Sequence, residues 1–396
     1  MLRNPSEIFL ASMAMIFSLP YLVWRFFKTD NYAPLVVIQI ISGIVLGPAL
    51  TGKIFPEFYN AVFTADNIKV LSGIAWWGVM LFVWTAGIEL DIKSAIKNRK
   101  ETAITAAFAL GSPLLFGSAL AFTLSFYNGW MGNSASTWQF VLGIGMATAV
   151  TALPILVLLL DKLNILKKDL GKRVLRYASL DDILIWAVLA VIIMDWERVM
   201  RQAIFLPIFA GMAYLINLLM PKIKESRDRW ALSMFWIIFA GLAADWSGLH
   251  FMVGAFLSGA VMQSEWFNDK EMQLFKNNVL LVLMPVFFLI TGLKTNWSVS
   301  GFVVILVAFL LLVVQFASKI LGVKMAGKVL GWKKKDAMII GVLLQTKALI
   351  EIIFCTILLD KNIITSQTFT ALLLMAVFST ISTMPITRRL LKNDKK

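Results

Sequence analysis

The sequence consists largely of long apolar runs separated by short polar loops. A run of about 20 apolar residues crosses the ~30 Å hydrocarbon core of a bilayer as a helix. We therefore expect an all-α polytopic membrane protein with about thirteen transmembrane helices. The expected spans are 8–27, 33–50, 69–90, 103–126, 138–160, 174–194, 201–220, 231–248, 250–263, 277–294, 301–323, 337–359 and 366–387. The boundary between 248 and 250 is the weakest, and these two spans also fit one broken helix.

Two adjacent carboxylates, Asp181 and Asp182, lie inside the expected span 174–194. A charged side chain at the bilayer centre costs at least ~2.5–3.5 kcal/mol, so each one needs a partner or a function. If the span began after the pair, about 12 residues would remain, which is too few to cross. Adjacent residues on a helix point ~100° apart, so we expect one aspartate to face a cavity and the other a different helix.

The span 138–160 carries Thr148, Thr151 and Pro154 at its centre. Proline removes a backbone donor and clashes with the carbonyl four residues back, near Val150. Polar backbone freed in this way is tolerated only where protein or a water-filled cavity satisfies it. An ordinary proline kink is one interpretation. The aspartates on the next span favour the other, a helix broken at a binding site.

The span 337–359 is interrupted by Gln345, Thr346, Lys347 and Glu351. Lys347 and Glu351 are four residues apart on one face, but Lys before Glu is the weaker order, so their pairing is not expected to account for both. Two polar-interrupted helices in opposite halves of a chain are typical of an inverted-repeat secondary transporter with a site near the midplane.

Lys319 lies in the apolar run 301–323. Two interpretations stay open. The side chain extends to the cytoplasmic surface beside Lys324, or it lies deep in the protein as the counter-charge of one of the aspartates.

Two pairs of glycines in apolar runs are interpreted as packing positions. Gly43 and Gly47 are four residues apart, a spacing that lets helices approach closely, and Pro48 follows them. Gly254 and Gly259 are interpreted in the same way.

Composition agrees with a membrane protein. The 396 residues are 59% hydrophobic and 15% charged, and the mean hydropathy is +0.80. The net charge of +14 would suggest nucleic acid in a soluble protein, but here about four times as many Lys and Arg lie in one set of alternating loops as in the other. This bias predicts an outside N-terminus and a cytoplasmic C-terminus, and no nucleic-acid partner. The single cysteine, Cys355, excludes an intramolecular disulfide and a cysteine-rich metal site.

Eight motifs, taken together and in this order, resemble the monovalent cation:proton antiporter-2 family, near the plant cation/proton exchangers and their bacterial relatives. They extend over nearly the whole chain. The motifs are G-I-V-L-G-P (Gly43 to Pro48), A-G-I-E-L-D (Ala86 to Asp91), T-A-V-T-A-L-P (Thr148 to Pro154), L-D-D-I-L-I-W (Leu180 to Trp186), G-A-F-L-S-G (Gly254 to Gly259), P-V-F-F-L-I-T-G-L-K-T (Pro285 to Thr295), S-K-I-L-G (Ser318 to Gly322) and Q-T-K-A-L-I-E (Gln345 to Glu351).

This resemblance implies the inverted-repeat sodium/proton antiporter fold, with the spans 138–160 and 337–359 as two crossed, discontinuous helices. It implies a single transporter domain, 1–396, with a core subdomain near 69–194 and 277–387. A dimerisation subdomain near 8–50 and 201–263, a homodimer and elevator-like alternating access are implied as well.

The resemblance also assigns residues. It implies that Asp182 is the carboxylate that binds cation and proton, that Asp181 is its neighbour, and that Lys319 pairs with Asp181. Two departures from the family matter. Lys347-Ala348 stands where relatives often have a basic residue followed by glycine. We also expect no soluble nucleotide-binding domain after the last span.

We therefore predict an antiporter, not an enzyme, that exchanges Na⁺ or K⁺ for protons in the bacterial inner membrane. A carboxylate in a partly desolvated pocket binds a proton or a cation, but not both. Oxygen ligands from Asp182, Thr151 and freed backbone carbonyls suit such a hard cation. No cofactor is expected beyond the transported ions. The expected cation- and proton-binding residues are Asp182, Asp181, Thr151 and Thr148, with Lys319 as charge partner and Pro154, Gln345, Thr346, Lys347 and Glu351 in the crossing region.

A break of the Asp181–Lys319 pair on cation binding would release a second proton and make exchange electrogenic.

Three other classes of membrane protein use similar residues. A cation channel needs rings or carbonyl stacks, and the sequence has no obvious filter repeat. An intramembrane aspartyl protease needs aspartates that converge from two helices, which adjacent positions oppose. A sodium-coupled organic-anion carrier of related fold is the remaining alternative.

Overall fold

The computed structural model describes residues 4–29, 35–48, 50–89, 99–166, 168–194, 199–295, 301–347 and 349–392. Over these ranges the regular structure is helical, with one isolated β-bridge between Met131 and Ile364. Eight helices in the described ranges are long and apolar enough to cross a membrane. The prediction of an all-helical, multi-pass membrane protein is therefore confirmed, whereas the count of thirteen spans stays a prediction.

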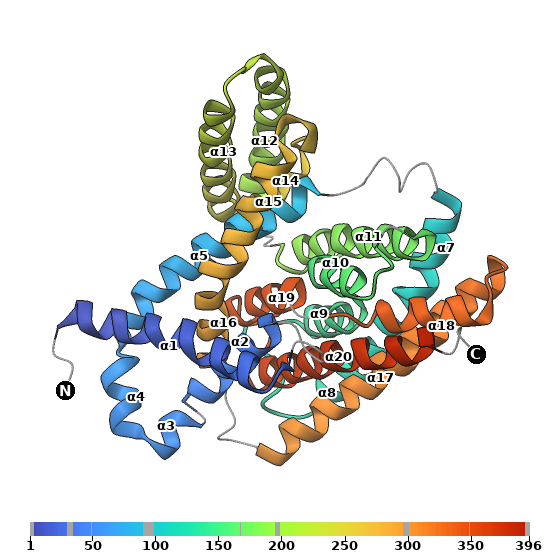
Figure 1. The fold of residues 1–396 in the computed structure, drawn as a ribbon, viewed down its shortest axis with the longest axis horizontal. Coiled ribbons are helices and arrows are strands. Elements are labelled where there is room, and N and C mark those ends of the chain that lie inside the picture. Colours follow the sequence, from blue (N-terminus) through green and yellow to red (C-terminus); the bar gives the residue numbers. More distant parts are fainter. Residues whose placement is uncertain are drawn as a thin grey trace. The chain divides into compact units, whose positions relative to one another are not determined.

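The chain forms two compact units, and the first comprises Met1–Asn67, Asp91–Ile185 and Phe288–Lys396. This unit carries the residues that the sequence assigns to the site. Figure 1 labels its helices, which are α1 (Pro5–Phe26), α2 (Leu35–Leu46), α3 (Thr51–Ile54), α4 (Pro56–Val62), α7 (Arg99–Ala109), α8 (Gly111–Leu124), α9 (Thr137–Ala149), α10 (Leu153–Lys162), most of α11 (Asp169–Ile192), part of α16 (Met284–Leu293), α17 (Gly301–Val329), α18 (Lys334–Leu343), α19 (Leu349–Asp360) and α20 (Ser366–Lys392).

The second unit comprises Ile68–Leu90 and Trp186–Phe287. Its helices are most of α5 (Ala65–Ile88), α12 (Val199–Leu219), η3 (Met220–Lys222), α13 (Ser226–Trp246), α14 (Phe251–Ala260), η4 (Ser264–Trp266), α15 (Asp269–Asn278) and the π-helix η5 (Val279–Leu283). The division into core and dimerisation subdomains that the sequence suggests stays a prediction.

Glycines allow close helix contacts within each unit. In the first unit, a Cβ atom on Gly43 of α2 would lie 2.6 Å from the carbonyl oxygen of Phe288 on α16. In the second, a Cβ atom on Gly254 of α14 would lie 2.3 Å from the carbonyl oxygen of Ala240 on α13. Both distances are too short for any other residue, so the interpretation of these glycines as packing positions is confirmed.

The helices α13 and α14 are separate. Gly248 lies between them with a φ of +93°, a conformation that favours glycine. The chain then folds back, and the indole of Trp236 on α13 donates a hydrogen bond of 3.0 Å to the carbonyl oxygen of Ser258 on α14. The interpretation of spans 231–248 and 250–263 as one broken helix is therefore wrong.

Two loops of the first unit are joined at the ends of α9 and α19. The backbone N–H of Gly132, before α9, donates to the carbonyl oxygen of Ile363, after α19. The hydroxyl of Thr368 on α20 donates to the carbonyl oxygen of Trp130 at 2.6 Å. The helix α9 is one half of the first polar-interrupted span, and α19 is one half of the second. These bonds therefore hold the ends of the two half-helices together.

Candidate functional site

Both polar-interrupted spans contain a non-helical segment. The first breaks between the end of α9 at Ala149 and the start of α10 at Leu153, and Val150 and Ala152 have extended backbone. Pro154 is the second residue of α10, a position where proline is tolerated because its missing N–H would have no helical acceptor. The second breaks between the end of α18 at Leu343 and the start of α19 at Leu349. The first span is thus interrupted and is not a continuous, kinked helix.

The two breaks are hydrogen-bonded to each other. The backbone N–H of Ala152 donates to the carbonyl oxygen of Thr346 at 2.9 Å. The hydroxyl of Thr151 donates to the carbonyl oxygen of Leu344 at 2.8 Å. Backbone groups that lose their helical partners are therefore satisfied by the opposite break, as a buried membrane segment requires.

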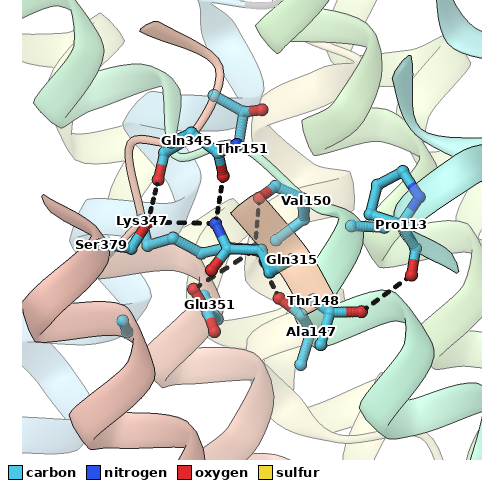
Figure 2. A network of polar contacts seen from close by, with 12 residues as sticks. Pro113, Ala147, Thr148, Val150, Thr151, Gln315, Gln345, Lys347, Glu351 and Ser379 are labelled. Carbon is cyan, nitrogen blue, oxygen red and sulfur yellow. Dashed lines mark hydrogen bonds and ion pairs between the residues drawn. The ribbon is translucent and has the colours of Figure 1, made fainter. Parts of the chain in front are cut away.

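Two lysines donate hydrogen bonds to backbone carbonyls at the C-terminal end of α9. The ammonium of Lys347 donates to the carbonyl oxygens of Ala147 at 2.6 Å and Val150 at 2.8 Å (Figure 2). The ammonium of Lys319 on α17 donates to the carbonyl oxygen of Ala149. Cations are stabilised at a helix C-terminus, where the carbonyl dipoles concentrate negative charge.

Lys319 also forms an ion pair with Asp181. Its ammonium nitrogen lies 3.2 Å from a carboxylate oxygen of Asp181 on α11, and the lysine side chain is only 1% exposed. The lysine is therefore buried in the protein and does not extend to its surface, which favours the deep counter-charge among the two sequence interpretations. Its role as charge partner stays a prediction. Asp182, the next residue on α11, is fully buried.

The pair of Lys347 and Glu351 that their spacing allows is present, but it is loose. Their nearest charged atoms are 3.7 Å apart, and both side chains are buried. Neither carboxylate oxygen of Glu351 has a hydrogen-bond partner in the part of the chain that the structure describes. As expected, this pair does not by itself account for both residues, since Lys347 makes its shorter contacts with the α9 carbonyls.

Two polar residues near the second break were missed from the sequence. The side-chain amide of Gln315 on α17 donates to the side-chain oxygen of Gln345 and, at 3.0 Å, to the hydroxyl of Ser379 on α20. That hydroxyl in turn donates to the backbone carbonyl of Gln345 at 2.7 Å (Figure 2). A signal was present, because Gln315 lies four residues before Lys319 and therefore on the same helical face.

The remaining predicted residues are buried in the same unit. The hydroxyl of Thr148 lies 2.7 Å from the carbonyl oxygen of Gly145 and 3.1 Å from that of Pro113 on α8. The hydroxyl of Thr346 donates to the carbonyl oxygen of Leu343. The structure thus brings Thr151, Thr346 and Lys347 together at the breaks, and the joining of Asp182 with Thr148 and Thr151 around one ion stays a prediction.

The sequence profile of a family described as "Sodium/hydrogen exchanger, transmembrane" matches residues 12–392. Cation/H(+) antiporter 15 of Arabidopsis thaliana is 27% identical over 412 residues, which cover 99% of this chain and 50% of that protein. K(+)/H(+) antiporter 1 of Saccharomyces cerevisiae is 27% identical over 383 residues, covering 90% and 43%. This chain therefore spans about half the length of these relatives.

A shorter relative and a solved structure match from end to end. Na(+)/H(+) antiporter NhaS4 of Synechocystis is 26% identical over 407 residues, covering 97% of each chain. The sodium proton antiporter MjNhaP1 of Methanocaldococcus jannaschii superimposes with a TM-score of 0.64 and 13% identity, covering 98% of this chain and 99% of that one. At this identity the superposition shows a shared fold.

Proposed function

Because the chain belongs to the sodium/hydrogen exchanger family, we propose that it is a secondary antiporter that exchanges a monovalent cation, Na⁺ or K⁺, for protons. The observation that carries this proposal is the buried ion pair of Asp181 and Lys319. Lys319 also binds the carbonyl at the end of α9, so the pair joins the aspartate helix to the first break. Buried ionisable residues in membrane proteins mark ion pathways and proton relays.

In this proposal Asp182 is the residue that carries either ion. Asp182 is fully buried, and it follows Asp181 on α11. A negative charge at such a position is costly unless it is neutralised, as a proton or a cation would do. Competition of the two ions for one carboxylate, with movement across the membrane only when the site is neutral, gives exchange. Asp181, Thr148 and Thr151 supply further oxygens, which suit a hard cation.

The Asp181–Lys319 pair sets the stoichiometry in this scheme. Cation binding draws Asp181 away from Lys319, which then loses a proton. A second proton comes from Asp182, so two protons exchange for one cation and transport is electrogenic. The direct 3.2 Å contact between the two charged groups supports this step.

The finer architecture is part of the same proposal. The two interrupted helices cross at their mutually bonded breaks, and the region that contains them moves as an elevator within a homodimer. The excess of basic residues in alternate loops supports an outside N-terminus and a cytoplasmic C-terminus. The end-to-end match with a cyanobacterial antiporter supports a bacterial inner membrane.

The test is dissipation of a pH gradient in vesicles that contain the purified protein. Vesicles with an acidic interior are diluted into NaCl, KCl or choline chloride, and a pH-sensitive dye reports proton efflux. We expect efflux with Na⁺ or K⁺ and none with choline.

Asp182→Asn should abolish this proton efflux while the protein still inserts and folds. Asp161→Asn, which changes an exposed carboxylate near the end of α10, is the matched control and should retain exchange.

Each failure of this experiment has its own meaning. An Asp182→Asn protein that still releases protons when cations are added contradicts the assignment of the carrying residue. Cation flux without proton movement indicates a channel. A pH gradient that is insensitive to every cation leaves the organic-anion carrier.

A further inference from the structure

The ammonium of Lys347 occupies a position built from oxygen atoms. Two backbone carbonyl oxygens, those of Ala147 and Val150, lie 2.6 and 2.8 Å from it. A carboxylate oxygen of Glu351 lies 3.7 Å away, and the lysine side chain is only 1% exposed. Figure 2 shows these groups converging on the lysine from α9 and α19. The position is thus a buried oxygen cluster that holds a tethered positive charge.

The same set of groups would suit a free monovalent cation. Unwound backbone carbonyls and the C-terminal ends of half-helices coordinate Na⁺ in transporters with broken helices. Carbonyl oxygens also replace the hydration shell of K⁺ in channel filters. A lysine ammonium is a compact, strongly hydrated point charge and therefore resembles such an ion more closely than a guanidinium does.

Glu351 provides an independent sign of a cation position. Both of its carboxylate oxygens are buried and lack a hydrogen-bond donor among the described residues. The nearest positive group, Lys347, is closer to the carbonyls than to this carboxylate. A buried carboxylate in such a setting needs a neighbouring charge, since an uncompensated one is strongly destabilising.

We propose that Lys347 occupies a second monovalent-cation position, separate from Asp182, and that its ammonium keeps Na⁺ and K⁺ out of it. The ligands of this position are the carbonyl oxygens of Ala147 and Val150 and the carboxylate of Glu351. Lys347 thereby limits the chain to one exchangeable cation. Removal of the amine opens the position to Na⁺ or K⁺.

The rest of the position does not depend on the lysine side chain. The backbone N–H of Lys347 is held by the hydroxyl of Thr380 at 3.2 Å. The neighbouring N–H of Ala152 and hydroxyl of Thr151 hold the two breaks together. A small residue at 347 therefore leaves the ligand oxygens in place and leaves room for an ion between them.

The experiment measures cation binding by Lys347→Ala in the Asp182→Asn background, which removes the proposed primary site. Thermal unfolding in detergent is followed in NaCl, KCl and choline chloride at equal ionic strength. We expect the unfolding temperature of the double variant to rise with the concentration of Na⁺ or K⁺ and to reach a plateau. It should not respond to choline. Adding Glu351→Gln should weaken this response by about tenfold or more, because a charged ligand is lost. Lys347→Arg, which keeps the charge, should gain no response.

Two results would overturn the proposal. One is a Lys347→Ala double variant whose unfolding temperature responds equally to Na⁺, K⁺ and choline. The other is a Na⁺ or K⁺ response that Glu351→Gln leaves unchanged. If the variant does not fold in choline, recovery of folded protein in Na⁺ or K⁺ supports the proposal. Failure in all three salts while Lys347→Arg folds counts against it, since a free ion then cannot replace the amine.

The test of the second cation position is independent of the test of the proposed exchange, because it measures cation binding and not transport. Isothermal titration of Lys347→Ala with Asp182 intact should give about one more bound cation per chain than the wild type. A wild type that fails to exchange cations for protons refutes the proposed function and leaves this count unaffected. Equal counts in the two proteins refute the second position alone.

Discussion

The ammonium of Lys347 donates a hydrogen bond of 2.8 Å to the carbonyl oxygen of Val150. In a continuous helix that carbonyl would accept from the backbone N–H of residue 154, four positions later. Residue 154 is a proline and has no N–H. The second interrupted span therefore supplies, through a lysine side chain, the donor that the first span lacks.

Replacing this proline tests whether the break itself is needed for ion binding. Pro154→Ala restores the N–H and allows helix to form through residues 150–152. We expect an unchanged or higher unfolding temperature, since alanine is the strongest helix former and a helix continued through residue 154 would no longer hold a proline in its interior, which costs ~3 kcal/mol. Apparent cation affinity in the vesicle assay should fall.

The control for this substitution is Pro207→Ala in α12, a proline inside a continuous helix of the other unit. It should leave the concentration for half-maximal exchange unchanged. Wild-type affinity in Pro154→Ala would mean that the cation binds elsewhere than at the first break.

Thr151→Val removes the hydroxyl that joins the two breaks while keeping the shape of the side chain. The carbonyl of Leu344 then loses a buried donor, worth about 0.5–1.5 kcal/mol. If this energy holds the breaks in their binding geometry, the half-maximal cation concentration should rise by roughly two- to tenfold. The unfolding temperature should fall only slightly.

Thr356→Val is the matched control for Thr151→Val. The Thr356 hydroxyl is also buried, but it donates to the carbonyl oxygen of Ile352 within the same helix, α19. Its loss should lower stability to a similar extent without changing the cation dependence of exchange. Equal cation dependence in the two variants would assign Thr151 a structural role only.

The contact between α2 and α16 predicts a stability effect. In Gly43→Ala the new Cβ atom would lie 2.6 Å from the backbone carbonyl oxygen of Phe288, which cannot rotate away. We expect a loss of about 1–3 kcal/mol, as for other overpacked sites, measured as a lower unfolding temperature in detergent. Gly73→Ala, in open space on α5, should be neutral or stabilising. The prediction is wrong if the two variants unfold at the same temperature.

Local pattern was enough to locate the long apolar helices and to favour an interruption in two of them. Apolar runs define membrane helices because the bilayer forces backbone groups to pair within each segment. Pro154 and the polar stretch at Gln345 to Lys347 then identified where that pairing fails. The approach of Lys319 to Asp181 followed from resemblance, and the buried contact agrees with it.

The partners of Lys347 could not be predicted in this way. A helical pattern reports only neighbours on the same helix, so it indicated Glu351, four residues later. The shorter contacts are made with backbone carbonyls 200 and 197 residues away. Backbone acceptors have no sequence signature, and Gln315 was overlooked because a single amide in an apolar run resembles a packing residue. Contacts of this kind are decided by how distant helices meet.

The final prediction concerns voltage. Asp181→Asn removes the counter-charge of Lys319 and leaves its ammonium with the carbonyl of Ala149. In the proposed scheme the Lys319 proton is exchanged only because the ion pair breaks when the cation binds. Without the pair this proton is no longer coupled, and exchange becomes one proton for one cation. We therefore expect wild-type exchange to respond to an imposed membrane potential, and a folded Asp181→Asn variant to respond much more weakly.

The matched control for the voltage prediction is Asp360→Asn. It breaks the half-exposed pair of Lys294 and Asp360 at 2.6 Å and should retain the wild-type voltage response. Vesicle exchange measured at several potentials decides the matter. A wild type that is indifferent to the potential would refute the two-proton scheme, and an Asp181→Asn variant with full voltage response would remove Asp181 from it.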